Sequence, residues 1–350
     1  MRDRLLHIGI GAAATLLLAS SGASAAPIAS SGPGEKGAAE LREYWTPERM
    51  RAAEPLDLAR PVADLSESLD IRAAAGIAKP KSVRSAPSSY AAVTQTNTTA
   101  PGTRTHGKVF GSSASGNFSC SATVVNSPNE STVWTAAHCI YYNASEGFST
   151  NLVFVPGYNQ GARPFGTWTA RNSFVPANWV SSGASDFRDD VGTLLIQKKL
   201  REKTTREKRK CNRRFEGKPG RKRRCRRKQV WGSIKDKVGA RGITFSQDPN
   251  DFIYRAFGYP AQPSSRFDGE HLELCVSEFT GVDGGYPEDP KPISMACDMQ
   301  EGSSGGGWVI SRGRVNGNVS YGYHTLDPNH SYSPYFDDFT KRFYNAIKNK

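Results

Sequence analysis

Short runs of β-branched and aromatic residues recur along most of this chain, separated by glycine, asparagine and serine. Runs of this length and composition predict β-strands, and the clusters between them predict turns. The runs occupy residues 108–110, 122–125, 133–136, 152–155, 191–197, 252–258, 271–276, 308–311 and 319–323. Because no helical period intervenes between them, the sequence predicts an all-β barrel or sandwich.

The C-terminal end of the chain has a different period. Phe336, Phe339, Phe343 and Ile347 are spaced three or four positions apart, which places them on one face of a helix. We therefore expect an amphipathic helix within residues 335–350, packed on the β-structure through this face.

The first 25 residues are organised like a secretory signal peptide. Two arginines lie within residues 1–4, an apolar run follows over 5–18, and Ala23-Ser24-Ala25 has the small-x-small pattern that signal peptidase recognises. The run is shorter than the roughly 20 residues that span a bilayer, which argues against a membrane anchor, and no second apolar run offers one. We expect cleavage after Ala25 and a secreted, extracellular protein.

Six cysteines are present, and secretion determines how they are interpreted. Disulfides persist in oxidising compartments, so we expect three of them. Several connectivities are open for six cysteines. Proximity in the sequence favours Cys211 with Cys225 and Cys275 with Cys297.

Residues 26–104 are rich in alanine, serine, proline and charged side chains and contain few aromatics. One octet, 43–50, has the features of a helix start. Thr46 can cap, Pro47 suits the first helical position, and Glu48 faces the positive end of the helix dipole. We interpret residues 26–104 as a pro-segment that is removed on maturation, with a disordered linker as the alternative.

Two motifs carry the chemistry. Residues 135–139 read Thr-Ala-Ala-His-Cys after an apolar run, and residues 302–307 read Gly-Ser-Ser-Gly-Gly-Gly. They resemble the histidine and nucleophile signatures of the chymotrypsin-like serine peptidases, with Ser303 in place of an aspartate and Gly307 in place of a proline. A lone histidine or a glycine-rich loop is more often structural. Both motifs occur here in the family's order, and the resemblance covers residues 105–350 outside a central basic stretch.

The resemblance implies a fold of two antiparallel six-stranded β-barrels followed by the C-terminal helix. It makes His138 the general base, Ser304 the nucleophile, and the backbone N–H groups of Gly302 and Ser304 the oxyanion hole. It also implies a disulfide between Cys120 and Cys139. The reaction would be acyl transfer through an acyl-enzyme.

The third member of the triad has to be chosen among neighbouring carboxylates. Asp190 begins an aliphatic run, and the family pattern selects it over Asp189 and Asp186. Ser303 removes the aspartate against which digestive members seat a new amino terminus, so that mode of activation is not expected. The chain is more similar to secreted bacterial members, including relatives of the glutamyl endopeptidases, which share Phe-Gly-Tyr-Pro at 257–260.

Substrate preference has two opposing indications. Asp298 lies six residues before Ser304, where trypsin-like members have the aspartate that binds Lys or Arg. Ser320 and Gly322 lie in a segment that resembles the strand that binds substrate backbone. Glutamyl members have a histidine near the position of His324, which could bind an acidic side chain. A basic P1 preference, an acidic one and a preference for neither therefore all stay open.

Residues 198–228 contain eighteen lysines and arginines against three glutamates, a formal charge of +15, whereas the whole chain carries +13. The basicity is thus one local feature, which Cys211 and Cys225 are expected to close into a loop. It is either a solvated, self-repelling loop or a patch that binds a polyanion such as a wall polymer, a nucleic acid or a heparin-like chain. Phe215 is its one aromatic residue, so base stacking is not indicated.

These features predict a secreted, monomeric serine endopeptidase that acts on protein or peptide substrates without a cofactor, a metal ion or a membrane anchor. The alternative is a catalytically silent homologue that uses the barrel and the basic loop only to bind polyanions. A nucleic-acid-binding protein, which charge alone suggests, explains neither the signal peptide nor the two motifs.

Overall fold

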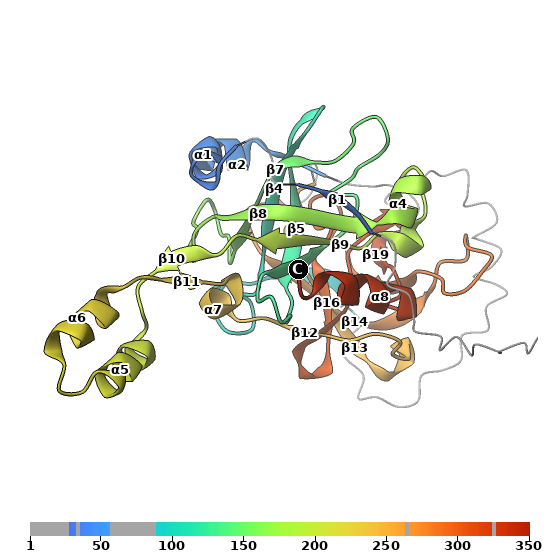
Figure 1. Cartoon of the computed structure of the whole chain (residues 1–350). Helices are drawn as coiled ribbons and strands as arrows, with labels where there is room; N and C mark the ends of the chain where they lie inside the picture. The colour runs from blue at the N-terminus through green and yellow to red at the C-terminus, as the bar shows by residue number, and fades with distance from the viewer. Residues whose placement is uncertain (1–27, 33–35, 57–88, 263–265, 324–326) are drawn as a thin grey trace, which may run out of the picture.

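The computed structural model describes residues 28–32, 36–56, 89–262, 266–323 and 327–350. The expected signal peptide, residues 1–25, and His324 lie outside these ranges. Two sheets form the body of the molecule, and a helix near the C-terminus packs on them (Figure 1). None of the helices in the described ranges has the length and hydrophobicity needed to span a membrane.

The first sheet closes into an antiparallel barrel. Its six strands are β4 (His106–Ser113), β5 (Gly116–Val124), β6 (Thr132–Thr135), β7 (Thr150–Pro156), β8 (Trp168–Pro176) and β9 (Gly192–Ile196). They follow the order β8-β7-β4-β5-β6-β9, and the pairing of β8 with β9 closes the ring. Two short N-terminal strands extend it, since β1 (Ile28–Ser31) pairs with β8 and β2 (Glu54–Pro55) with β5.

The second sheet follows the order β12-β17-β16-β13-β14-β15-β19-β18, and β3 (Ser89–Thr94) pairs with β14. Its other strands are β12 (Gly242–Ile243), β13 (Ile253–Gly258), β14 (Glu273–Val282), β15 (Ile293–Ala296), β16 (Gly307–Ile310), β17 (Arg314–Asn318), β18 (Tyr321–Tyr323) and β19 (Asp327–Ser333). The closed barrel and this sheet confirm the expected chymotrypsin-like architecture.

The C-terminal helix α8 (Asp338–Ile347) is anchored on the first barrel. Phe343 and Ile347 are fully buried, and the ring of Phe343 lies 5.9 Å from that of Trp134 in β6. Asp337 caps the helix by accepting a hydrogen bond from Thr340. The expected amphipathic helix is therefore present, and it begins three residues after the predicted start at 335 because Asp337 provides the cap.

Part of the N-terminal region packs on the two sheets. Helices α1 (Ala38–Tyr44) and α2 (Pro47–Arg51) flank Trp45, which is fully buried, as is Met50. Thr46 accepts a hydrogen bond from the backbone of Arg49, and Pro47 takes the first helical position, as the sequence predicts. Trp45 and Met50 belong to one core cluster with side chains of β4 and β7.

The basic insert is a helical hairpin on a two-stranded stalk. Strands β10 (Lys199–Arg201) and β11 (Val230–Gly232) form the stalk, and α5 (Thr205–Arg214) and α6 (Pro219–Arg227) form the hairpin. The disulfide Cys211–Cys225 joins the two helices. Figure 1 shows the hairpin at the left, away from the two sheets.

Short helices fill the remaining connections: α4 (Ala177–Ser181), α7 (Ile234–Val238), and the 3-10 turns η2 (Phe187–Asp189), η3 (Pro249–Asp251) and η4 (Ser311–Gly313). Of these, η2 matters most for the site, because it ends immediately before Asp190 and sets the direction in which that side chain leaves the backbone.

Candidate active site

His138 lies in the turn that follows β6, and its side chain is fully buried. The disulfide Cys120–Cys139, with an S–S distance of 2.08 Å, ties this turn to β5. The pairing is the one that the family resemblance implies. Because β5 is a central strand of the closed barrel, the crosslink holds the histidine turn against a rigid wall.

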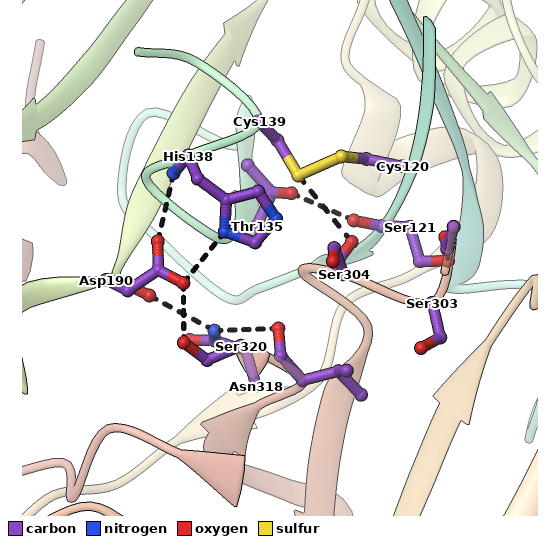
Figure 2. Close-up of a disulfide and its surroundings, with 12 residues drawn as sticks. Cys120, Ser121, Thr135, His138, Cys139, Asp190, Ser303, Ser304, Asn318 and Ser320 are labelled. Atoms are coloured by element: carbon purple, nitrogen blue, oxygen red, sulfur yellow. Dashed lines mark hydrogen bonds and ion pairs between the residues drawn. A yellow bond between two sulfur atoms is a disulfide. The ribbon is translucent and has the colours of Figure 1, made fainter. Parts of the chain in front are cut away.

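The imidazole of His138 is fixed by Asp190 (Figure 2). Nδ1 of His138 lies 2.9 Å from Oδ2 of Asp190, and the backbone N–H of His138 donates to Oδ1 at 2.9 Å. A carboxylate accepts, so the proton of the neutral ring lies on Nδ1. The other nitrogen, Nε2, is thereby left without a proton.

Further bonds hold Asp190 in place. The hydroxyl of Ser320 donates to Oδ2 of Asp190 at 2.5 Å, and the side-chain amide of Asn318 donates to its backbone carbonyl at 3.2 Å. Trp134 in β6 donates in turn to Oδ1 of Asn318 at 3.1 Å. Ser320, expected among the substrate-binding residues, thus contacts the aspartate, and Asn318 is a positioning residue that sequence reasoning missed.

The competing carboxylates point elsewhere. Asp186 caps η2 and forms an ion pair with Arg188 at 2.7 Å. Burial, with the nearby charge of Asp186, raises the pKa of Asp189 to about 6. Of the three candidates, Asp190 is therefore the one that reaches the imidazole.

The loop that contains Ser304 has no room for side chains at the two glycines that follow it, Gly305 and Gly306. At Gly305, φ is +83°, and an added Cβ would lie 2.0 Å from Oγ1 of Thr135. The carbonyl of Ser304 accepts from the backbone N–H of Ser121 at 2.7 Å, and Sγ of Cys139 lies 3.7 Å from the same oxygen. The loop is thus pressed against the histidine turn, and the glycines are needed for this close approach.

Nε2 of His138 is buried and hydrogen-bonds no other described residue. Ser304 is only 1% exposed. An unprotonated imidazole nitrogen without a hydrogen-bond partner can accept the proton of a hydroxyl or of an amine, and the carbonyl of Ser304 lies 3.7 Å from Sγ of Cys139, the residue after His138. The same three residues could therefore support nucleophilic acyl transfer.

The cluster formed by Cys120, His138 and Cys139 has atoms close enough to hold a metal ion, but both sulfurs are joined in the disulfide. A cysteine binds a metal ion as its thiolate. These two sulfurs are therefore not available as ligands.

The residues expected to set specificity include Asp298, whose side chain is already bonded within the chain, and Gly322. Asp298 accepts a hydrogen bond from the backbone N–H of Ala92 in β3 at 2.7 Å and lies 3.1 Å from the guanidinium of Arg266. Gly322 lies in β18, two positions after Ser320, whose hydroxyl donates to Asp190. The disulfide Cys275–Cys297, which the sequence also predicts, ends next to Asp298. The Asp298 carboxylate is thus already bound within this chain.

The expected oxyanion hole has an unexpected neighbour. The backbone N–H of Gly302, where φ is +80°, donates to the carbonyl of Leu56 at 3.1 Å. Leu56 donates in turn to the carbonyl of Ser119 in β5 at 2.9 Å. No local pattern around Leu56 signals this contact, because the partners are distant in the sequence.

Solved structures of similar proteins identify the family. A thermostable serine protease AL20 from an extremophilic microorganism is 30% identical with a TM-score of 0.56, and the match covers 72% of this chain and all of that one. The protease Anisep from Arthrobacter nicotinovorans is 30% identical with a TM-score of 0.54, over 71% of this chain and 96% of that one. The chain belongs to the chymotrypsin-like serine proteases.

A Glu endopeptidase shares the fold of this serine protease, with a TM-score of 0.53 at 18% identity, over 74% of this chain and 97% of that one. No protein-family model and no curated protein sequence matches the chain. Family membership makes the protease a hydrolase of protein or peptide substrates.

The protease carries a second charged feature in its helical hairpin. Helix α6 has no buried residue, and arginine and lysine side chains line a groove on it: Arg223, Arg224, Arg227 and Lys228. Lys208 pairs with Glu202 at 3.2 Å, which neutralises a small part of the charge. The hairpin therefore presents most of its cations to solvent.

Proposed function

We propose that this protein is a secreted serine endopeptidase with His138, Asp190 and Ser304 as its catalytic triad. The observation that supports it most is the pair of bonds between His138 and Asp190, at 2.9 Å each, together with the unbonded, buried Nε2. This arrangement has one nitrogen fixed and the other free to move a proton.

In the proposed reaction, Nε2 of His138 takes the proton of the Ser304 hydroxyl as Oγ attacks a peptide carbonyl. The N–H groups of Gly302 and Ser304 stabilise the negative charge that develops on the carbonyl oxygen. His138 then gives its proton to the leaving amine, and water hydrolyses the acyl-enzyme by the same steps. Asp190 keeps the ring in the right tautomer and stabilises the imidazolium.

Covalent labelling tests the assignment. A fluorophosphonate probe should label the chain after prolonged incubation, and Ser304→Ala should abolish the label. Ser303→Ala is the matched control, because it removes a buried hydroxyl one position away that bonds the carbonyl of Gln300 instead. If the label survives Ser304→Ala, or disappears only in Ser303→Ala, Ser304 is not the nucleophile.

We further propose that residues 1–25 direct secretion, that residues 26–104 form a pro-segment, and that residues 105–350 are the monomeric peptidase domain. Mass spectrometry of the culture supernatant identifies the mature N-terminus directly. A chain recovered from the medium that still begins at Met1 contradicts the signal assignment.

The P1 preference is proposed as basic or acidic, and the two are separated experimentally. Asp298 supports binding of Lys or Arg, whereas His324 supports binding of an acidic side chain. Cleavage of a peptide library gives the preference, and Asp298→Asn should reduce cleavage after basic residues alone. If cleavage after Lys and Arg is equal in the two chains, Asp298 does not bind the P1 side chain.

A second proposed activity is binding of a polyanion by the helical hairpin. The exposed cations of α6 and the net charge of residues 198–228 support it, because a polyanion that binds there releases its condensed counterions. Replacement of residues 200–231 by a short turn should lower the salt concentration at which the protein elutes from heparin. Elution that is unchanged after the replacement contradicts this activity.

A further inference from the structure

The segment Glu54–Pro55–Leu56 lies along the edge of the candidate active site. Glu54 and Pro55 pair with Phe118 and Ser119 of β5 in a parallel register. The carbonyl of Leu56 accepts a hydrogen bond from the N–H of Gly302, the group proposed to stabilise the oxyanion. The Gly302 N–H, which is proposed to bind the substrate's carbonyl oxygen, is thus bonded to a backbone carbonyl of the chain itself.

A second N-terminal piece takes the other expected substrate contact. In β3, the N–H of Ala92 donates to Oδ1 of Asp298, and the carbonyl of Tyr90 accepts from the backbone N–H of Asp298 at 2.9 Å. The guanidinium of Arg266 donates both to Asp298 and to the carbonyl of Ala92. The side chain of Asp298 is therefore satisfied from within and has less affinity to offer a basic P1 residue.

The triad is shielded in this arrangement. His138 and Asp190 have no exposed surface, and Ser304 retains 1%. A peptide bond must reach Ser304 Oγ and both oxyanion donors at once. In the described conformation the Gly302 N–H is bonded to Leu56 and is not available to a substrate carbonyl.

We propose that residues 54–56 inhibit the peptidase in cis by holding the Leu56 carbonyl on the N–H of Gly302. The inference rests on the proposed function, since it assigns Gly302 to the oxyanion hole. The segment needs little intrinsic affinity, because it is tethered to Trp45 and Met50, whose buried side chains keep its effective concentration high.

Two substitutions at one position test the contact in the full chain. Leu56→Pro removes the N–H that donates to Ser119 and restricts Pro55, so it should release the carbonyl from Gly302. Leu56→Ala is the matched control, because it keeps both backbone bonds. We expect Leu56→Pro to react with a fluorophosphonate roughly tenfold faster than the wild type, which corresponds to losing one moderate interaction, and Leu56→Ala to react at close to the wild-type rate.

Mass spectrometry must show that each chain is uncleaved during the measurement. Met50→Ala removes a buried anchor ahead of the contact and should also accelerate labelling, so it decides the matter if Leu56→Pro does not fold. Equal rates for the wild type and for the folded variants overturn the inhibition while leaving the proposed function intact. If no chain labels above the Ser304→Ala background, the proposed function fails and the inhibition with it.

Discussion

Replacing Trp45 tests whether the N-terminal helices are part of the folded body or merely rest on it. The indole is fully buried, its ring centroid lies 5.5 Å from that of Phe110 in β4, and Nε1 donates to the carbonyl of Asn151 at 2.8 Å. Trp45→Ala removes these contacts and leaves a cavity that the strands of a closed barrel cannot collapse to fill. We expect it to lower the free energy of unfolding by about 3–5 kcal/mol.

Urea unfolding followed by far-UV circular dichroism measures this loss, in a Ser304→Ala background that prevents self-cleavage. Glu43→Ala is the control, since Glu43 is exposed on α1 and should change the free energy by less than about 0.5 kcal/mol. Trp45→Phe should fall between the two, because it keeps a ring against Phe110 and loses the donor to Asn151.

A loss below about 1 kcal/mol for Trp45→Ala would refute the reasoning, because even a partly relaxed site for a buried tryptophan costs more. It would mean that the helices undock before the barrel unfolds. Their removal with a pro-segment would then leave the peptidase domain nearly as stable as before.

Three further predictions concern the glycine-rich loop, Asp189 and the hairpin. Gly305→Ala would place Cβ 2.0 Å from Oγ1 of Thr135, and it should slow fluorophosphonate labelling roughly 100-fold; a rate within tenfold of wild type would contradict the need for glycine. Because burial raises the pKa of Asp189 to about 6, the folded state favours its protonated form and loses stability as pH rises toward 6. Asp189→Asn should therefore raise the free energy of unfolding by about 1–3 kcal/mol at pH 8, and the melting temperature with it, but should change neither at pH 4. A difference independent of pH would exclude this cause. Replacing Cys211 and Cys225 by serine should destabilise the hairpin by about 3 kcal/mol and speed its proteolysis, without lowering the melting temperature of the barrels; a lower melting temperature would show that hairpin and barrels are coupled.

The sequence predicted the parts of this protein that depend on local chemistry. The motif around His138 and the glycine-rich loop around Ser304 each need particular residues at adjacent positions, so both are visible in one chain. The choice of Asp190 over Asp189 followed from a family pattern. In the structure η2 ends at Asp189, and the next side chain, that of Asp190, bonds the imidazole.

Contacts between distant segments could not be predicted in this way. Leu56 and Gly302 are joined by a hydrogen bond between backbone atoms. Such a bond does not require a particular side chain, so it leaves no pattern in the sequence. Asn318 is a partial exception, because an asparagine in the run before Ser320 is unusual for a buried strand. Its bond to the Asp190 carbonyl accounts for it.

The hairpin was expected as a loop and is a pair of helices instead. Thr204 and Glu207 form a capping box in which the threonine side chain accepts from the Glu207 N–H and the glutamate accepts from the Thr204 N–H. This start signal was readable in the sequence. The density of like charges masked it, because such stretches are usually unstructured.

The two-stranded stalk has a consequence for how this protein can change over generations. Lys199 pairs with Gly232 and Leu200 with Trp231, so the insertion leaves and re-enters the barrel at adjacent points. The geometry at the barrel is therefore the same whatever the length or charge of the sequence beyond the stalk. The entropic cost of closing a longer loop is only slightly larger. The hairpin can be lengthened, lose charge or be exchanged while His138, Asp190 and Ser304 stay where they are, so the proposed binding and the proposed catalysis can be selected separately within one gene.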